Sequence, residues 1–402
     1  MNEFRNGWRE LTGATIGLAC GIGCYTPVSS FFLRALEREF GWSKTAAAAS
    51  FIALPLTALL LPFTGKLLDR FGVRRVAFIS VLLLSACFFL LSAMNGQLAF
   101  FYAAFFGLWI FGSATGPIGY TRTIAQCFKR SRGAALAIAL LGIASAGMIL
   151  PPVIASVITG GGWRDGYRLL AMMALVGGCV AILLIRSLPV ARSASEAGAE
   201  NTLGHVVRRP EFWLLGLSIF CISVGCFGFI SQFQSIVIEK GIAIERAPLL
   251  LSLVAASVFV SRLVVGFLLD TARAELVSAG VLLLAGVGAA VWLLGPSTFG
   301  MALIAVLLLA MSIGAELDLM SFFCARLFGV RHYAAAYGAL AIFFYCGIAV
   351  GGIAYGAIHD KTGSYSAGIA ASCILFVVSA ILFLMLRPAS NRALAASKLA
   401  AS

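Results

Sequence analysis

The amino-acid sequence predicts an all-α membrane protein with twelve transmembrane helices in two pseudo-symmetric six-helix bundles. Three observations predict this fold class: the composition, a series of long apolar runs, and features that repeat about 200 residues apart. Hydrophobic residues make up 61% of the 402 residues, charged residues make up 11%, and the mean hydropathy is +1.01. A water-soluble domain carries about 25% charged residues, so most of the surface of this protein is expected to face lipid.

The apolar runs define the predicted helices, since a membrane-spanning helix needs about 20 apolar residues. The first run is too long for the core of a signal peptide and lacks a small-residue cleavage site, so we expect it to be retained. The twelve predicted spans are 11–34, 44–64, 76–94, 98–122, 133–158, 167–186, 212–236, 247–268, 276–294, 299–325, 334–356 and 365–386.

Repeated features divide the chain into two halves. Asp69 has a counterpart in Asp270, and Phe128 and Phe328 each precede an Ala pair by six residues. The polar, small-residue-rich segment 187–210 is predicted to be a linker between helical bundles at 1–186 and 211–402. Two parallel repeats of this kind imply a substrate site near the membrane midplane, between the halves, and alternating access to that site.

The net charge of +13 is distributed unevenly along the chain. With both termini inside, the cytoplasmic segments and the span ends next to them hold 19 of the 29 Lys and Arg residues, and the exterior loops and the span ends next to them hold 8. This asymmetry predicts a multi-pass protein of the cell inner membrane with both termini in the cytoplasm. Basic loops of this kind face anionic membrane lipids, so no nucleic-acid partner is expected.

Enzymatic chemistry has no support in the sequence. None of the ten cysteines has metal-ligand spacing, and no nucleophile–base arrangement or nucleotide-binding loop is present. The three histidines lie at loops or helix ends, which makes a buried histidine relay unexpected. We therefore predict a protein without cofactor or metal that is not an enzyme.

A basic, glycine-containing segment separates the second and third apolar runs. Gly65-Lys-Leu-Leu-Asp69-Arg70-Phe-Gly72-Val-Arg74-Arg75 resembles the G-x-x-x-D-R-x-G-R-R loop of the major facilitator superfamily. Its glycines would permit a tight turn, and Asp69 would face a helix N-terminus. The resemblance implies a conformational latch, formed by Gly65, Asp69, Arg70, Gly72, Arg74 and, in the second half, Asp270. The alternative is a loop that only sets membrane topology.

A second segment narrows the resemblance to a subfamily. Phe128-Lys-Arg130-Ser-Arg132-Gly133-Ala-Ala135 is similar to a stretch of the monocarboxylate transporter family and its bacterial oxalate:formate antiporter relatives. Three further segments resemble the same subfamily: Phe40-Gly41-Trp42-Ser43, Gly162-Trp163-Arg164 and Arg262-x3-Gly266. The resemblance covers the whole chain and implies a secondary active transporter that works as a monomer and carries an organic monocarboxylate.

Ionisable residues inside the apolar runs are functional candidates, because each costs at least about 2.5–3.5 kcal/mol at the bilayer centre. They are Arg122, Arg262, Glu316 and Asp318. Arg262 lies near the middle of the eighth run, and its planar guanidinium can hold a carboxylate through two hydrogen bonds. The subfamily's substrate-binding arginine stands in an Arg-Pro-x-x-Gly context, which Arg262-Leu-Val-Val-Gly266 matches without the proline. A purely structural ion pair is the alternative, and Arg122 is expected to have a structural role.

Glu316 and Asp318 lie at a similar depth in the tenth run. Two residues apart on a helix, they point about 200° apart, so at most one can face Arg262. That acid would neutralise Arg262 in the empty site, and a carboxyl there would suit a proton carrier. Gly314 and Ala315 leave room beside Glu316, which favours Glu316 as the partner; a fixed structural pair is the alternative for either acid.

Polar side chains on other runs are candidate hydrogen-bonding partners for the substrate, with a helix-packing role as the alternative for each. They are Tyr25, Tyr120, Gln232, Gln234 and Tyr337.

The sequence departs from the subfamily at three places. Val258 and Val28 stand where proton-coupled members carry an Asp and a Lys, and 334–356 contains no Lys or Arg. The missing Asp and Lys argue against ordinary proton–lactate symport. A second basic residue is expected in the eleventh run of an oxalate carrier, so a single buried arginine favours a monoanion over a dianion. Coupling through Glu316 or Asp318 and plain exchange both remain open, and the 31 phenylalanines leave an aromatic acid as one option. The alternatives to an organic-acid carrier are an exporter that binds a cationic or amphipathic solute at Glu316 or Asp318, and a sensor that couples binding to a partner.

Overall fold

The protein is described by a computed structural model that covers residues 2–128, 132–186, 204 and 206–388. All regular secondary structure among these residues is helical, with no β-strand. The chain divides into two compact units, residues Met1–Ser193 and Ala194–Ser402. Most of the segment predicted as a linker, 187–203 and 205, lies outside the described residues.

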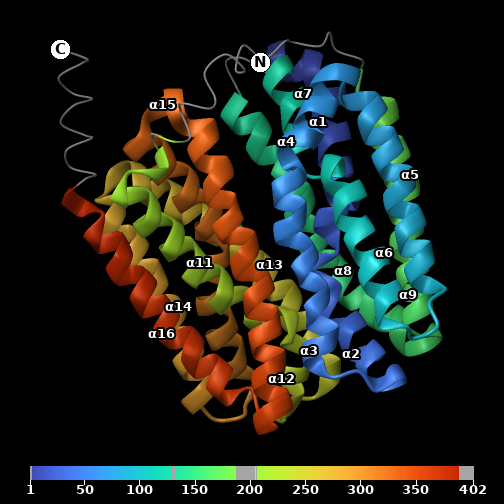
Figure 1. Cartoon of the computed structure of the whole chain (residues 1–402), viewed down its shortest axis with the longest axis vertical. Coiled ribbons are helices and arrows are strands. Elements are labelled where there is room, and N and C mark those ends of the chain that lie inside the picture. The colour runs from blue at the N-terminus through green and yellow to red at the C-terminus, as the bar shows by residue number, and fades with distance from the viewer. Residues whose placement is uncertain (1, 129–131, 187–203, 205, 389–402) are drawn as a thin grey trace. The chain divides into compact units, whose positions relative to one another are not determined.

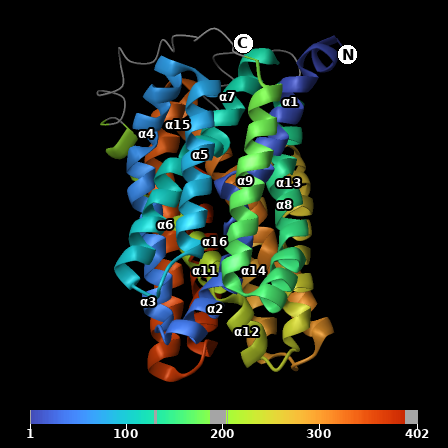
Figure 2. The ribbon, with the colours of Figure 1, turned by 90° about the vertical axis from the view of Figure 1, so that its right-hand side faces the viewer.

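The N-terminal unit is built from helices that pack around α1. In this unit α1 contacts α7, α8 and α9, while α5 lies against α6 and α9 (Figures 1 and 2). Its helices are α1 Asn2–Cys20, η1 Ile22–Cys24, η2 Thr26–Val28, α2 Ser29–Phe40, α3 Lys44–Ala48, η3 Ala49–Ile52, α4 Ala53–Phe71, α5 Val73–Ser92, α6 Leu98–Gly112, η4 Ser113–Thr115, α7 Pro117–Cys127, α8 Arg132–Gly161 and α9 Trp163–Leu184.

The first predicted span is broken rather than continuous. Its two halves, Glu3–Cys20 and Ile22–Phe40, meet at a 46° bend. A Cβ at Gly21 would lie 2.3 Å from the carbonyl oxygen of Thr115, and the hydroxyl of Thr115 accepts a hydrogen bond from the N–H of Ile22 at 3.1 Å. The missing side chain therefore lets the chain approach η4 closely, and the threonine satisfies a backbone donor that the bend releases. Pro27 just beyond the bend also lacks an N–H, which favours a break here.

The predicted latch segment is more helical than we expected. We predicted the second span to end at residue 64, but α4 continues to Phe71, so Gly65 lies inside a helix rather than in a turn. The turn consists of Gly72 alone, at φ 81° and ψ 152°, a conformation open mainly to glycine. The apolar run ends before the helix does, because hydropathy reports contact with lipid and not hydrogen bonding of the backbone.

The C-terminal unit has α11 and α15 at its centre. In this unit α11 contacts α15 and α16, and α15 also contacts α13 and α14 (Figure 1). Its helices are α11 Pro210–Ser231, α12 Phe233–Glu239, η6 Ile244–Arg246, α13 Ala247–Thr271, α14 Ala274–Leu294, α15 Phe299–Thr362 and α16 Ser366–Met385. The 64-residue α15 comprises the tenth and eleventh spans, which meet at a break at Gly329, where φ is 72° and ψ is 167°.

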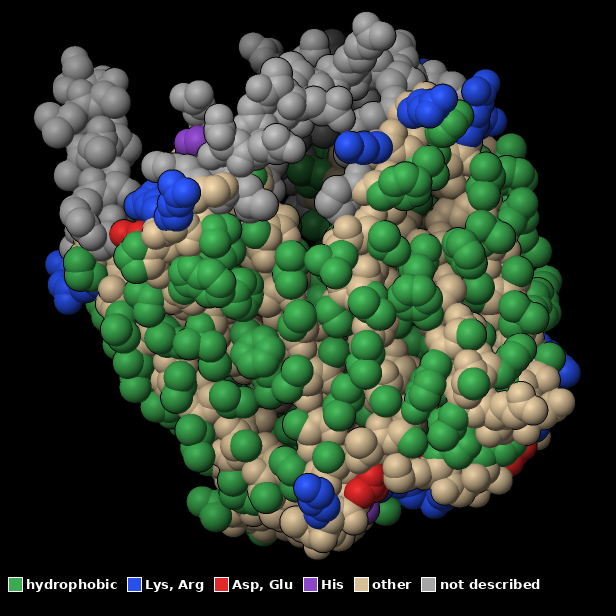
Figure 3. Space-filling model, in the orientation of Figure 1, with side chains coloured by type: hydrophobic (Ala, Val, Ile, Leu, Met, Phe, Trp, Pro, Cys, Tyr) green, Lys and Arg blue, Asp and Glu red, His purple; other side chains and the backbone are tan. Residues whose placement is uncertain are grey.

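The described helices have the length and composition of membrane spans. Eleven are long and apolar enough to cross a bilayer, and the bent first pair brings the number to as many as twelve. On the face in view in Figure 3, hydrophobic side chains cover the middle of each unit and charged side chains gather near the ends of its helices. The predicted fold class, an all-helical membrane protein with about twelve spans, is confirmed.

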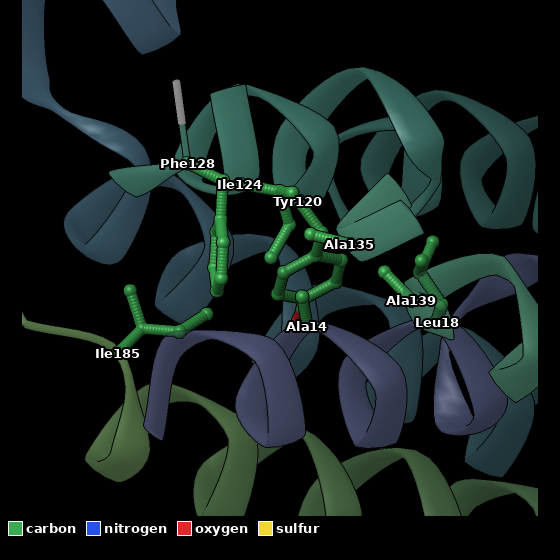
Figure 4. Packing of buried hydrophobic residues seen from close by; sticks show 8 residues of the cluster. All are labelled: Ala14, Leu18, Tyr120, Ile124, Phe128, Ala135, Ala139 and Ile185. Carbon is green, nitrogen blue, oxygen red and sulfur yellow. The ribbon is translucent and has the colours of Figure 1, made fainter. Parts of the chain in front are cut away.

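Interior packing within the N-terminal unit is apolar. One cluster joins α1, α7 and α8 to Ile185, the residue that follows α9 (Figure 4). Its buried members are Ala14, Leu18, Tyr120, Ile124, Phe128, Ala135, Ala139 and Ile185. Phe128, the aromatic residue of the predicted subfamily motif, is fully buried here, so it contributes to packing of the unit.

Candidate functional site

The candidate site lies in the C-terminal unit, where α13 and the first half of α15 approach each other closely. A Cβ at Gly314 would lie 2.6 Å from the carbonyl oxygen of Val258 and 2.8 Å from the Cβ of Ser261. Ser257 and Ser261 donate hydrogen bonds from α13 to the carbonyl oxygens of Leu307 and Met311, at 2.8 and 2.6 Å. A small residue and interhelical hydrogen bonds are the usual means of holding two membrane helices in close contact.

This contact brings Arg262 next to Asp318. The Nη1 of Arg262 lies 3.9 Å from the Oδ1 of Asp318, and the two side chains are 33% and 32% exposed. A long, partly exposed ion pair of this kind contributes little to stability. Our preference for Glu316 as the partner of Arg262 was therefore wrong, because the face of α15 toward α13 carries Asp318.

Glu316 points instead toward α11. It is 1% exposed, and its Oε1 accepts a hydrogen bond from the hydroxyl of Ser223, which is fully buried. Among the described residues, no Lys, Arg or His nitrogen lies within 4.0 Å of its carboxylate. The two acids thus lie on different sides of one helix, as their spacing predicted, and have different surroundings.

A second polar contact lies one turn from Glu316 on the same interface. Cys226 Sγ and Ser312 Oγ are 3.0 Å apart, and Ser312 also donates to the carbonyl oxygen of Leu309 at 2.7 Å. Since α11 and this half of α15 run in opposite directions, the pairs 223–316 and 226–312 form two successive polar contacts between them. Polar contacts of this kind hold helices together in an apolar surrounding.

Tyr25 and Gln232 lie in comparable places, at a break in the first helix of each unit. The hydroxyl of Tyr25 is 3.3 Å from that of Tyr167, and both residues are fully buried. Gln232 separates α11 from α12, and its Oε1 accepts a hydrogen bond from the hydroxyl of Tyr365 at 3.1 Å. Its buried Nε2 has no hydrogen-bond partner among the described residues.

The other predicted hydrogen-bonding residues have varied surroundings. Tyr120 is fully buried in the cluster of Figure 4, and its hydroxyl has no hydrogen-bond partner among the described residues. A Cβ at Gly17 would lie 2.3 Å from its ring, so this glycine makes room for the tyrosine. Gln234 on α12 and Tyr337 on the second half of α15 are half-buried. A contact between these side chains and a substrate stays a prediction.

The predicted latch residues lie at the ends of α4 and α13. Arg70 and Arg74 are exposed, and the guanidinium of Arg70 lies 5.2 Å from the ring centre of Phe71. The side chains of Asp69, Asp270 and also Arg122 lie outside the described part of the structure. The latch role of this segment therefore remains a prediction.

Sequence reasoning missed Ser223, Glu39 and Glu239. Glu39 accepts hydrogen bonds from the indole N–H of Trp163 and, at 2.7 Å, from the guanidinium of Arg164. Glu239 accepts hydrogen bonds from the hydroxyl of Ser364 at 2.6 Å and from the backbone N–H of Tyr365 at 3.1 Å. The repeated pattern Glu-x-Gly, at 39–41 and 239–241, was a signal that could have identified both glutamates. Ser223 has no such signal, since serines occur throughout these helices.

Comparisons with known proteins agree with this fold. The model of the Major Facilitator Superfamily matches residues 13–352, so the chain belongs to this superfamily and is a membrane transporter. It is also 26% identical over 368 residues to the uncharacterized MFS-type transporter YhjX of Escherichia coli (strain K12), covering 88% of this chain and 87% of that protein.

Two solved structures are similar to the chain in fold. Both are crystal structures of a bacterial homolog of the human lysosomal transporter Spinster in an inward-facing conformation. The unoccupied form has a TM-score of 0.73 at 16% identity, covering 96% of this chain and 97% of the other. The occupied form has a TM-score of 0.67 at 17% identity, covering 98% and 97%. At these identities the likeness supports the fold alone.

Proposed function

We propose that this transporter moves an organic monocarboxylate across the cell inner membrane by alternating access, coupled to protons or by exchange. The observation that carries the proposal is the loose Arg262–Asp318 pair in the middle of two apolar helices. An arginine held at 3.9 Å by a partly exposed acid is available to a second carboxylate, which it can bind through two hydrogen bonds. The subfamily resemblance of the loop segments supports the same substrate class.

Asp318 has a distinct role in this proposal. In the empty carrier it neutralises Arg262, so the cation is not left alone in an apolar surrounding. When the substrate carboxylate arrives, it replaces Asp318 as the partner of Arg262. Because one guanidinium binds one carboxylate in this way, the substrate is a monoanion.

Glu316 is the proposed proton-binding group. An ionised carboxylate without a nearby cation is unfavourable inside a protein, and such a group tends to take up a proton instead. Its burial at 1% exposure and its single described hydrogen bond, from Ser223, fit this role. Proton binding at Glu316 and substrate binding at Arg262 would then occur on two sides of the same helix.

Uptake into proteoliposomes tests the proposal. A labelled panel of short-chain and aromatic carboxylates is offered with an inward proton gradient, and wild type is compared with Arg262→Gln. A hydrogen bond to a charged group contributes about 1.5–3 kcal/mol, so we expect loss of the guanidinium to raise KM roughly tenfold or more. Arg246→Gln is the matched control, because Arg246 lies just before α13, is exposed, and has its guanidinium 5.2 Å from the ring centre of Phe299. Saturable uptake that Arg262→Gln leaves unchanged would overturn the proposal.

One observation favours a second candidate function, the export of a cationic or amphipathic solute. Glu316 has no basic side chain within 4.0 Å among the described residues, so a substrate cation could occupy that place. The same proteoliposomes separate the two functions. Inhibition by many small carboxylates favours the first, whereas transport of organic cations that Glu316→Gln abolishes and carboxylates do not inhibit favours the second.

A further inference from the structure

Ser223 lies at a junction of three helical segments. It is carried by α11, it is fully buried, and its hydroxyl donates to Oε1 of Glu316 on the first half of α15. On the second half of α15, a Cβ at Gly347 would lie 2.5 Å from the Cβ of Ser223 and 2.8 Å from the carbonyl oxygen of Phe220. The absent side chain at Gly347 therefore lets a third segment press against the residue that binds Glu316.

The hydrogen bond from Ser223 stabilises the ionised form of Glu316 and not the protonated form. A hydroxyl that donates to a carboxylate stabilises the ionised form, whereas removal from water disfavours that form. Ser223 is the one described hydrogen-bond donor to Glu316, and its effect is opposed by the apolar surroundings. Loss of this hydrogen bond would therefore leave the ionised carboxylate without its described donor.

The helical segments packed against the first half of α15 carry several other titratable groups, among them Cys221 on α11 and Tyr345, Cys346 and Tyr355 on the second half of α15. Cys226 on α11 is paired with Ser312, and Asp318 on the same helix faces Arg262 of α13. On α14, Glu275 lies 3.8 Å from Arg326, and on α16 the titratable group is Cys373. None of these supplies a cation to Glu316 among the described residues.

We propose that Ser223 is the positioning residue that sets the proton affinity of Glu316. This inference rests on the proposed function, in which Glu316 binds the coupling proton. With Glu316 ionised, Ser223 donates to its carboxylate. When the carboxylate takes up a proton, the new O–H donates to Ser223 Oγ, and the serine hydroxyl turns to the carbonyl oxygen of Ile219, four residues earlier in the helix. The Ser223–Glu316 hydrogen bond is thus kept in both states with donor and acceptor exchanged, which lowers the cost of taking up and releasing the proton.

The test is the pH profile of proton-driven uptake in proteoliposomes that contain the full-length protein. Ser223→Ala removes the donor that stabilises the ionised carboxylate, so Glu316 takes up its proton at a higher pH. We expect the midpoint of the profile to move about one to two pH units to the alkaline side, the range for a hydrogen bond to a charged group. Ser223→Thr keeps the hydroxyl and is expected to keep the wild-type midpoint.

Ser312→Ala is the matched control, since it removes the neighbouring polar contact without touching Glu316. We expect its midpoint to equal that of wild type. In a Glu316→Gln background, Ser223→Ala should cause no further shift of the profile. A Ser223→Ala protein that only transports more slowly, with an unchanged midpoint, overturns the inference, and so does an equal shift in Ser312→Ala.

A second measurement serves where a variant does not transport. Infrared spectroscopy of the purified protein follows the C=O band of the protonated carboxyl that Glu316→Gln removes, as a function of pH. An alkaline shift of this titration in Ser223→Ala supports the inference, and an unshifted titration overturns it. If the pH profile of uptake is the same in wild type and in Glu316→Gln, the proton role of Glu316 is wrong, and this inference is wrong with it. If the profile changes in Glu316→Gln but not in Ser223→Ala, only this inference is wrong.

Discussion

Glu39 and Glu239 occupy equivalent positions in the two units, and each binds the start of the last helix of its own unit. Glu39 holds Trp163 and Arg164 of α9, and Glu239 holds Ser364 and the backbone N–H of Tyr365, the residue before α16. Each glutamate stands two residues before a glycine at positive φ, Gly41 and Gly241. The two-fold repeat of the sequence therefore extends to individual hydrogen bonds.

The contact made by Glu239 predicts a stabilising role. Its carboxylate accepts hydrogen bonds at the N-terminus of α16, so Glu239→Ala should lower the free energy of unfolding by about 0.5–2 kcal/mol, the usual value for loss of a helix cap. Thermal unfolding in detergent measures the effect. Glu245→Ala is the control, since Glu245 is exposed and forms no described hydrogen bond or ion pair. Equal melting temperatures for both variants would contradict the capping role.

The close contact of α13 and α15 predicts that Gly314 tolerates no side chain. In Gly314→Ala the new Cβ would meet Val258 and Ser261, so the helices must separate. We expect a loss of about 1–3 kcal/mol in stability and a larger loss of uptake, because Arg262 and Asp318 move apart. Gly338→Ala, on the same long helix, places its Cβ in open space and should behave as wild type. Wild-type uptake by Gly314→Ala would show that the site does not depend on this contact.

Partial exposure of the Arg262–Asp318 pair predicts that it contributes little to stability. Pairs of this kind contribute about 0–1 kcal/mol, so Asp318→Asn should unfold close to wild type. Under the proposed function the variant loses the competitor for Arg262, and we expect a lower KM together with a lower maximal rate. Asp165→Asn breaks a partly exposed ion pair with Arg168 in the other unit and should change neither constant. A strongly destabilised Asp318→Asn protein would instead indicate a fixed structural pair.

The Tyr25–Tyr167 pair predicts coupled effects on stability. Tyr25→Phe leaves the buried hydroxyl of Tyr167 without its described partner, at a cost of about 1–3 kcal/mol. The double variant Tyr25→Phe/Tyr167→Phe should cost less than the sum of the single variants, because no hydroxyl is then left unpaired. Denaturant unfolding of the four proteins gives the coupling energy. Additive losses would mean that the two hydroxyls do not interact.

The sequence predicted the fold class and the membrane spans, and its errors concern where individual helices end or break. Hydropathy located the spans because lipid contact requires long apolar runs, but it could not place the end of α4 or the break at Gly21, which depend on backbone hydrogen bonds. The broken first span follows from the contact of Gly21 with Thr115, residues 94 positions apart in the chain. No local pattern records such a contact.

For the candidate site, the sequence by itself determined which charges are costly in a membrane, and that two acids two residues apart point in different directions. The reason is elementary: helix geometry and the energy of an ion in an apolar medium are local properties. Only the tertiary structure decided that Asp318 pairs with Arg262 and that Glu316 turns to Ser223. That choice depends on which face of α15 each neighbouring helix covers, and on the small residue at Gly314 that lets α13 approach, and these are properties of packing between distant segments.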